Sequence, residues 1–177
     1  MPKILESMRE QLLETARRQI VSAGYAETTI RSVAAECGIA VGTVYNYFPS
    51  KEMLIATFVS EDWRARITPI AEQRFNDAQT RLRAVYDAIR AFIDSYRSLF
   101  SDNDAKSAYY AAFSERHRQL RKQVAALVLP VCGNETDRAF LSEFIAESLL
   151  IWTIEGKPFE DLYSIIKRLI QREREEF

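Results

Sequence analysis

The fold of this chain is decided by the stretch Gly24–Glu52, which reads GYAETTIRSVAAECGIAVGTVYNYFPSKE. Gly24 is expected to end an amphipathic helix, because glycine adopts the positive φ that a helix C-terminus often requires. The pair Thr28–Thr29 then supplies a hydroxyl that can cap a second helix, whose apolar face carries Ile30, Val33, Ala34 and Cys37. Gly38 ends this helix, and a third short helix is predicted over about residues 41–47. The stretch therefore predicts two short helices joined by a glycine turn.

Pro49 and Ser50 are predicted to stop the third helix and to cap a longer fourth one. Val44 and Phe48 are assigned to the core, because they must hold the third helix against its neighbours. Two short helices in this order are the layout of a helix-turn-helix that enters a DNA major groove. The stretch resembles the DNA-binding domain of the TetR (tetracycline-repressor) family, and the resemblance covers about the first third of the 177 residues.

This resemblance implies an all-α protein with two domains. Residues 1–50 would form an N-terminal three-helix DNA-binding domain with the helix-turn-helix, and residues 51–177 a C-terminal helical bundle for ligand binding and dimerisation. Two positions depart from the usual family pattern. Ala40 stands where a serine commonly caps the recognition helix, and Ile20 where the first helix usually carries phenylalanine. The missing serine cap removes about 1 kcal/mol, which can weaken or retune DNA binding without abolishing it.

Each predicted DNA contact depends on its own chemistry. Gly42 lets the backbone approach DNA closely, because it has no side chain. The phenol groups of Tyr45 and Tyr47 can donate to phosphates, and the Lys51 ammonium is a point charge for the same groups. The predicted DNA-binding set is Thr29, Arg31, Val41, Gly42, Thr43, Tyr45, Asn46, Tyr47 and Lys51. A plain helical bundle can also contain two helices, a glycine turn and aromatic residues; the joint spacing favours the DNA interpretation.

Composition limits how the chain can bind DNA and where it works. The net charge is −1, and residues 1–66 carry eight basic and eight acidic side chains. Binding must therefore depend on the local placement of Arg31 and Lys51 and on helix dipoles, not on a global positive charge. The N-terminus carries charges too early for a signal peptide, and the apolar run 124–132 is too short to span a bilayer. A cytoplasmic protein without membrane contact is expected.

No catalytic, metal or cofactor site is predicted. His117 is the single histidine and lies in a highly charged stretch, while Cys37 and Cys132 are far apart in apolar surroundings. A transition-metal site needs more ligands than these, and no nucleophile elbow, phosphate loop or dinucleotide fingerprint is present. The cysteines are interpreted as small buried hydrophobes, with a redox switch as the alternative. An enzyme on a helical scaffold therefore has no support in the sequence.

The rest of the chain is predicted to be helical, and its last two helices are predicted to form a hairpin turned at residues 156–158. Their two apolar stripes exceed what one bundle face needs, and similar TetR-type proteins pair such hairpins across a two-fold axis. The interface residues implied in this way are Phe140, Phe144, Trp152, Leu162 and Ile166. The alternative is that both stripes only complete the core of the monomer.

A small-molecule effector is implied by the family resemblance rather than by the pattern. The aromatic residues that could line its pocket are Tyr86, Tyr96, Tyr109, Tyr110 and Phe113, although an aromatic stripe also fits a plain core. We therefore expect a ligand-responsive transcriptional regulator, with a repressor as the first interpretation and an activator as the alternative that the sequence leaves open. It would bind double-stranded operator DNA as a homodimer and release it when the effector binds. The alternative is a dimeric DNA-binding regulator whose C-terminal domain binds no small molecule and only dimerises or docks a protein partner.

Overall fold

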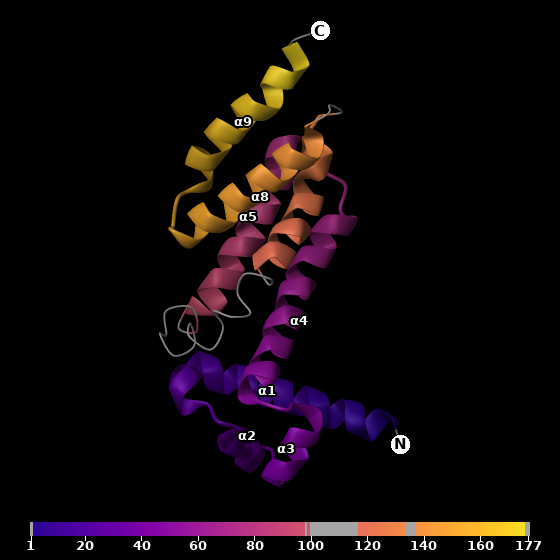
Figure 1. Ribbon diagram of the computed structural model, residues 1–177, viewed down its shortest axis with the longest axis vertical. Coiled ribbons are helices and arrows are strands. Elements are labelled where there is room, and N and C mark those ends of the chain that lie inside the picture. The colour runs from indigo at the N-terminus through magenta and orange to yellow at the C-terminus, as the bar shows by residue number, and fades with distance from the viewer. Residues whose placement is uncertain (1, 98, 100–116, 134–136, 176–177) are drawn as a thin grey trace. The chain divides into compact units, whose positions relative to one another are not determined.

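The computed structural model describes residues 2–97, 99, 117–133 and 137–175. Its elements are α1 (Pro2–Glu27), α2 (Ile30–Glu36), α3 (Val41–Tyr47), α4 (Lys51–Glu72), α5 (Ala78–Ser95), the 3-10 turn η1 (Leu129–Val131), α8 (Arg138–Ile154) and α9 (Phe159–Glu175) (Figure 1). Residues 117–128 are helical as well. These ranges contain no strand, so the predicted all-α fold is confirmed. Within them, no helix is long and apolar enough to cross a membrane.

The described residues divide into two compact units. The first unit contains residues 2–64, 95–97 and 99, and the second contains residues 65–94, 117–133 and 137–175. This division falls inside α4, between Arg64 and Ala65. The domain boundary expected after residue 50 stays a prediction. The first half of α4 belongs with α1–α3 because it contributes buried side chains to their core, namely Leu54, Ile55 and Phe58.

Both turns around α2 have the structure that the sequence predicted. Gly24 interrupts α1 with a φ of 86° and a ψ of −179°, a backbone conformation that would strain a side chain. Thr29 caps α2: its Oγ1 accepts from the Ser32 N–H at 2.9 Å, and Ser32 Oγ accepts from the Thr29 N–H at 2.9 Å. This capping box satisfies two backbone donors that would otherwise be left unpaired. Gly38 follows α2 with a φ of 67°.

The core of the first unit determines which side of α3 faces outward. Val44 and Phe48 are 0% and 4% exposed, as predicted for core residues. Burying such side chains stabilises the unit by about 1.5–3 kcal/mol each, so Val44 on α3 and Phe48 directly after its end hold one side of the helix inward. Figure 1 shows α2 and α3 side by side. The remaining helices contribute Leu12, Leu13, Ala16, Ile20, Ile30, Val33, Ala34, Leu54, Ile55 and Phe58 to this core.

In the second unit, α5 is held against the turn between α8 and α9. The inner face of α5 repeats every three or four residues and carries Leu82, Val85, Tyr86, Ile89 and Phe92. The Tyr86 hydroxyl donates to the Lys157 carbonyl oxygen at 2.8 Å, and its ring centroid lies 5.6 Å from that of Phe159. Gly156, with a φ of 79°, turns the chain from α8 into α9. The predicted helical hairpin is therefore present.

Candidate nucleic-acid interface

The outward face of α3 is formed by Gly42, Tyr45 and Asn46. These residues are spaced three and four positions apart, so they share one side of the helix. All three are exposed, and Tyr45 keeps 51% of its surface accessible. A phenol and a carboxamide can donate and accept hydrogen bonds at phosphates or at base edges. The face therefore carries groups suited to DNA next to a position without a side chain.

Gly42 is not required by the chain's own structure. Its φ is not among the positive values, which belong to Gly24, Gly38 and Gly156. A Cβ built on Gly42 meets no atom within 4 Å. Glycine inside a helix costs roughly 0.5–1 kcal/mol relative to alanine. Neither backbone conformation nor crowding demands glycine here, so the position leaves open the close approach of DNA that the sequence predicts.

Arg31 is exposed in the first turn of α2, and its guanidinium has no ion-pair or hydrogen-bond partner among the residues that the structure describes. Other arginines of the first unit pair internally, over the distances Arg9–Glu61 2.7 Å, Arg17–Asp62 3.1 Å and Arg18–Glu36 2.5 Å. A guanidinium without an internal partner can bind a phosphate through charge-assisted hydrogen bonds. Arg31 is thus available for such a contact.

Lys51, at the start of α4, lies against Tyr25 at the end of α1. Its ammonium donates to the Tyr25 carbonyl oxygen and lies 3.7 Å from the centroid of the Tyr25 ring. The Tyr25 hydroxyl in turn donates to Glu52 Oε1 at 3.1 Å. A hydrogen bond from Ser50 first, and then bonds from the Glu52 backbone and Tyr25, lower the pKa of the Glu52 carboxyl below its ordinary value. Lys51 therefore joins two helices, and its contact with a phosphate stays a prediction.

The other predicted DNA contacts occupy less open positions. Val41, Thr43 and Tyr47 are half-buried, so only part of each side chain can reach a ligand. Thr29 is exposed, but its hydroxyl already caps α2. Ala40 provides no side-chain cap for α3, as the sequence indicated. The structure brings the predicted set together in one unit, at the start of α2, along α3 and at the start of α4, and the assignment to DNA remains a prediction.

Some polar residues that organise this region have no sequence signal. Tyr25 reaches Glu52 across 27 positions, and Gln19 reaches Ser32 across 13. Helical periodicity relates residues three or four positions apart, so it cannot reveal pairs of this kind.

Two of the five predicted pocket residues can be located, and they belong to different units. Tyr86 is 7% exposed and packs against Phe159. Tyr96 is 1% exposed, its ring centroid lies 6.1 Å from that of Phe58, and its hydroxyl donates to Asp62 Oδ2 at 2.5 Å. The other three residues, Tyr109, Tyr110 and Phe113, lie outside the described residues. An effector pocket lined by this set therefore stays a prediction.

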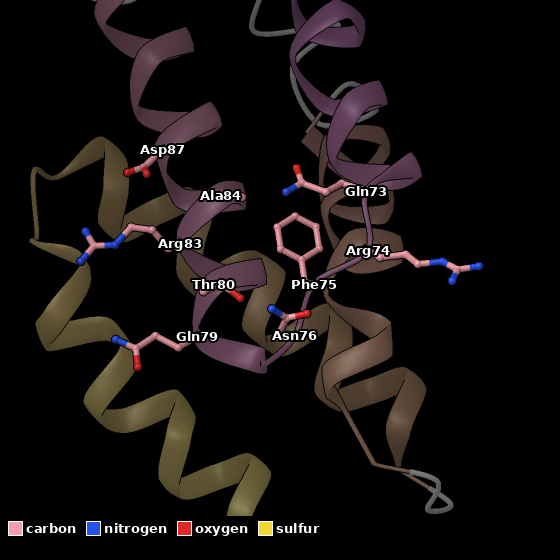
Figure 2. A pocket seen from close by; sticks show the side chains of 9 residues that line it. All are labelled: Gln73, Arg74, Phe75, Asn76, Gln79, Thr80, Arg83, Ala84 and Asp87. Atoms are coloured by element: carbon pink, nitrogen blue, oxygen red, sulfur yellow. The ribbon is translucent and has the colours of Figure 1, made fainter.

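A groove of about 520 Å³ lies where α4 connects to α5 (Figure 2). The Phe75 ring lies inside it beside Gln73, while Arg74 points away. The Arg81 guanidinium lies 4.7 Å from the centroid of the Phe75 ring. The lining residues are Gln73, Arg74, Phe75, Asn76, Gln79, Thr80, Arg83, Ala84 and Asp87. Effector sites are usually enclosed and lined mainly by hydrophobic and aromatic side chains, whereas this groove is open and most of the residues that line it are polar or charged, so it does not match the pocket expected from the sequence.

The predicted interface residues differ in where their side chains lie. On α8, Phe140 and Phe144 are 74% and 49% exposed, and Trp152 is half-buried. On α9, Leu162 and Ile166 are 1% and 3% exposed, so they fill the core of their own unit and do not face a partner directly. Helical periodicity identifies an apolar stripe, but it does not show whether the same chain or a partner covers that stripe. The apolar residues left open, called here the hairpin surface, are Phe140, Phe144, Ile151, Ile154 and Ile165.

Comparison with known proteins identifies the family. The family model for bacterial regulatory proteins of the tetR family matches residues 12–57, which contain both helices of the helix-turn-helix. The HTH-type transcriptional regulator HbdR of Aromatoleum sp. (strain CIB) is 33% identical over 175 residues, covering 93% of this chain and 76% of HbdR. The chain belongs to the TetR family.

Other TetR-family comparisons agree at lower identity or coverage. The HTH-type transcriptional repressor KstR2 of Mycobacterium tuberculosis (strain ATCC 25618 / H37Rv) is 29% identical over 127 residues, which cover 67% of this chain. The chain spans 63% of KstR2, less than two thirds of its length. The crystal structure of BioQ with its double-stranded DNA operator matches with a TM-score of 0.56 at 16% identity, covering 92% of this chain and 96% of BioQ. At that identity the likeness concerns the fold.

Proposed function

We propose that this TetR-family protein is a transcriptional repressor that binds double-stranded operator DNA through α3 and the first turn of α2. The observation that carries the proposal is the exposed face of Gly42, Tyr45 and Asn46. Within the chain, neither the backbone conformation nor crowding requires glycine at position 42. The names of HbdR and KstR2, a regulator and a repressor, support this function.

On this proposal, α3 lies in the major groove with Gly42 closest to the DNA. Asn46 can make a bidentate contact with adenine, and Tyr45 can donate to a base edge or a phosphate. Arg31 binds a phosphate and so contributes to affinity without reading sequence. Because the chain as a whole carries a net charge of −1, affinity should depend on local phosphate contacts and not on a global positive charge.

The repressor is proposed to act as a homodimer through the hairpin surface. One face of α8 carries four exposed apolar side chains, those of Phe140, Phe144, Ile151 and Ile154. A monomer would leave this apolar face in water, whereas a dimer would bury it. A two-fold dimer presents two recognition helices to successive major grooves, about 34 Å apart. Dimerisation would therefore double the contacts to an operator with two half-sites.

A small-molecule effector bound by the C-terminal domain is proposed to release the operator. Such release requires that the effector bind the two states of the protein with different affinity. The alternative, a regulator that only dimerises or docks a protein, is distinguished by a thermal-melt screen of small molecules. Compounds that raise the melting temperature should weaken DNA binding, and operator DNA should weaken their binding by the same factor.

The experiment selects a DNA duplex from a random pool with the wild-type protein and measures its dissociation constant over a range of salt concentration. Arg31→Ala should reduce the slope of log K against log salt by about one. The matched control is Arg74→Ala, because Arg74 is also exposed and has no partner among the described residues, yet lies in the second unit. No enrichment of any sequence, or equal effects of both substitutions, would contradict the proposed interface.

A further inference from the structure

A continuous set of hydrogen bonds joins α1 to one flank of α2. Ser32 Oγ donates to Gln19 Oε1 at 2.7 Å, and Gln19 Nε2 donates to Glu36 Oε2 at 2.5 Å. The other oxygen of Glu36 accepts from Arg18 at 2.5 Å. Ser32 lies in the first turn of α2 and Glu36 is its last residue. A single carboxamide, that of Gln19, therefore holds both ends of α2.

The apolar core sets which side of α2 faces inward, and directional hydrogen bonds can fix the rotation of α2 about its axis more finely. The helix has seven residues, of which Ile30, Val33 and Ala34 are buried, and apolar contacts have no preferred direction. Side chains end about 5–6 Å from a helix axis, so a rotation of about 20° moves a side-chain tip by about 2 Å. That displacement is larger than the roughly 0.5 Å range over which a hydrogen bond keeps good geometry. Directional bonds are therefore needed to aim a polar side chain of α2.

Arg31 is the side chain that such a rotation would displace. It directly precedes Ser32 and lies about 100° from it around the helix. Hydrogen bonds from Gln19 first and then from Arg18 lower the pKa of the Glu36 carboxyl, so Glu36 stays ionised and keeps both bonds at neutral pH. Gln19 is half-buried between the two helices, whereas Arg31 is exposed.

We infer that Gln19 is a positioning residue for DNA binding, which fixes the rotation of α2 and thereby aims the Arg31 guanidinium at a phosphate. This role rests on the proposed function, in which Arg31 makes that contact. Gln19 is uncharged and acts through Ser32 and Glu36. Removing the two hydrogen bonds of Gln19 should therefore change the salt dependence of DNA binding, a property that comes from the charge of Arg31.

The test compares Gln19→Met, which keeps the length of the side chain and loses both bonds, with Gln11→Met. Gln11 is an exposed residue of α1 with no partner among the described residues, so it is a matched control. On the duplex selected by the wild-type protein, Gln19→Met should weaken binding roughly 3- to 10-fold. It should also reduce the salt slope by about one, although no charge is removed. The control should change neither quantity.

A double-mutant cycle with Arg31→Ala separates this role from general stability. Arg31→Ala should weaken binding in the wild-type background and have little further effect in the Gln19→Met background. Additive effects, or an unchanged salt slope in Gln19→Met, would overturn the inference and leave the Arg31 assignment intact. An Arg31→Ala variant that binds like wild type would overturn both. If circular dichroism shows that Gln19→Met does not fold, Gln19→Ala, which favours helix, replaces it with the same expectations.

Discussion

Replacing Gly42 by alanine should stabilise the free protein and weaken its binding to DNA. The two effects have opposite signs because they come from different surroundings. In the free chain, the new Cβ meets no atom within 4 Å and the backbone needs no positive φ. In a complex in which α3 lies in the major groove, the same methyl group occupies the space through which DNA approaches the helix.

The size of each effect follows from the position. Glycine-to-alanine changes at compatible helical sites stabilise proteins by about 0.4–1 kcal/mol, chiefly by restricting the unfolded chain. For a chain of this length, about 1 kcal/mol raises the melting temperature by roughly 2–4 °C. A methyl group that displaces one charged hydrogen bond to DNA costs about 1.5–3 kcal/mol. Since 1.4 kcal/mol is tenfold in affinity, binding should weaken about 10- to 100-fold.

Thermal unfolding and a DNA titration on the selected duplex measure both quantities on one preparation. Gly38→Ala is the control for the stability argument, because Gly38 has a φ of 67° and its substitution should destabilise the protein by roughly 1–2 kcal/mol. If Gly42→Ala melts below wild type, the space around Gly42 has been misjudged. If it is more stable and still binds DNA as tightly as wild type, Gly42 does not mark the DNA-facing side of α3.

Three further substitutions test other parts of the molecule. Phe144→Asp places a charge on the exposed hairpin surface, so sedimentation should show a monomer. The variant should bind DNA more weakly, and its melting temperature at high dilution should be unchanged. A wild type that is monomeric at micromolar concentration would contradict the proposed dimer. Because the Glu52 pKa is lowered in the folded protein, its stabilisation is present above its unfolded value of about 4.3 and is lost as the pH falls through the lower folded value. Glu52→Gln should therefore reduce the free energy of unfolding at pH 7 by less than about 1 kcal/mol, and the difference from wild type in urea titrations should shrink below pH 4. Thr153 is 1% exposed, and its hydroxyl has no hydrogen-bond partner among the residues that the structure describes. Thr153→Val should therefore stabilise the protein by about 1 kcal/mol in the same titrations, and a loss of stability would show that the hydroxyl is satisfied.

Features that depend on neighbouring positions along the chain were predictable from the sequence. The limits of α3, the cap at Thr29 and the glycine turns at Gly24 and Gly38 all follow from residue types within a few positions of one another. The inward direction of Val44 follows from the helical repeat. A helix start or a tight turn is stabilised by local hydrogen bonds and backbone preferences, so its signal lies within one short stretch.

The sequence by itself thus determined an all-α chain with a helix-turn-helix and the side of α3 that faces outward. Only the tertiary structure decided that Arg31 has no partner among the described residues while Arg18 pairs with Glu36, and that Gln19 holds both ends of α2. It also decided that Leu162 is covered by its own unit while Phe144 stays open. The physical reason is that these distinctions depend on which helices pack together. The type and spacing of residues show which side chains are charged or apolar and which share a helix face. The folded chain brings each of them its partner from 13 or more positions away, and spacing does not reveal that partner.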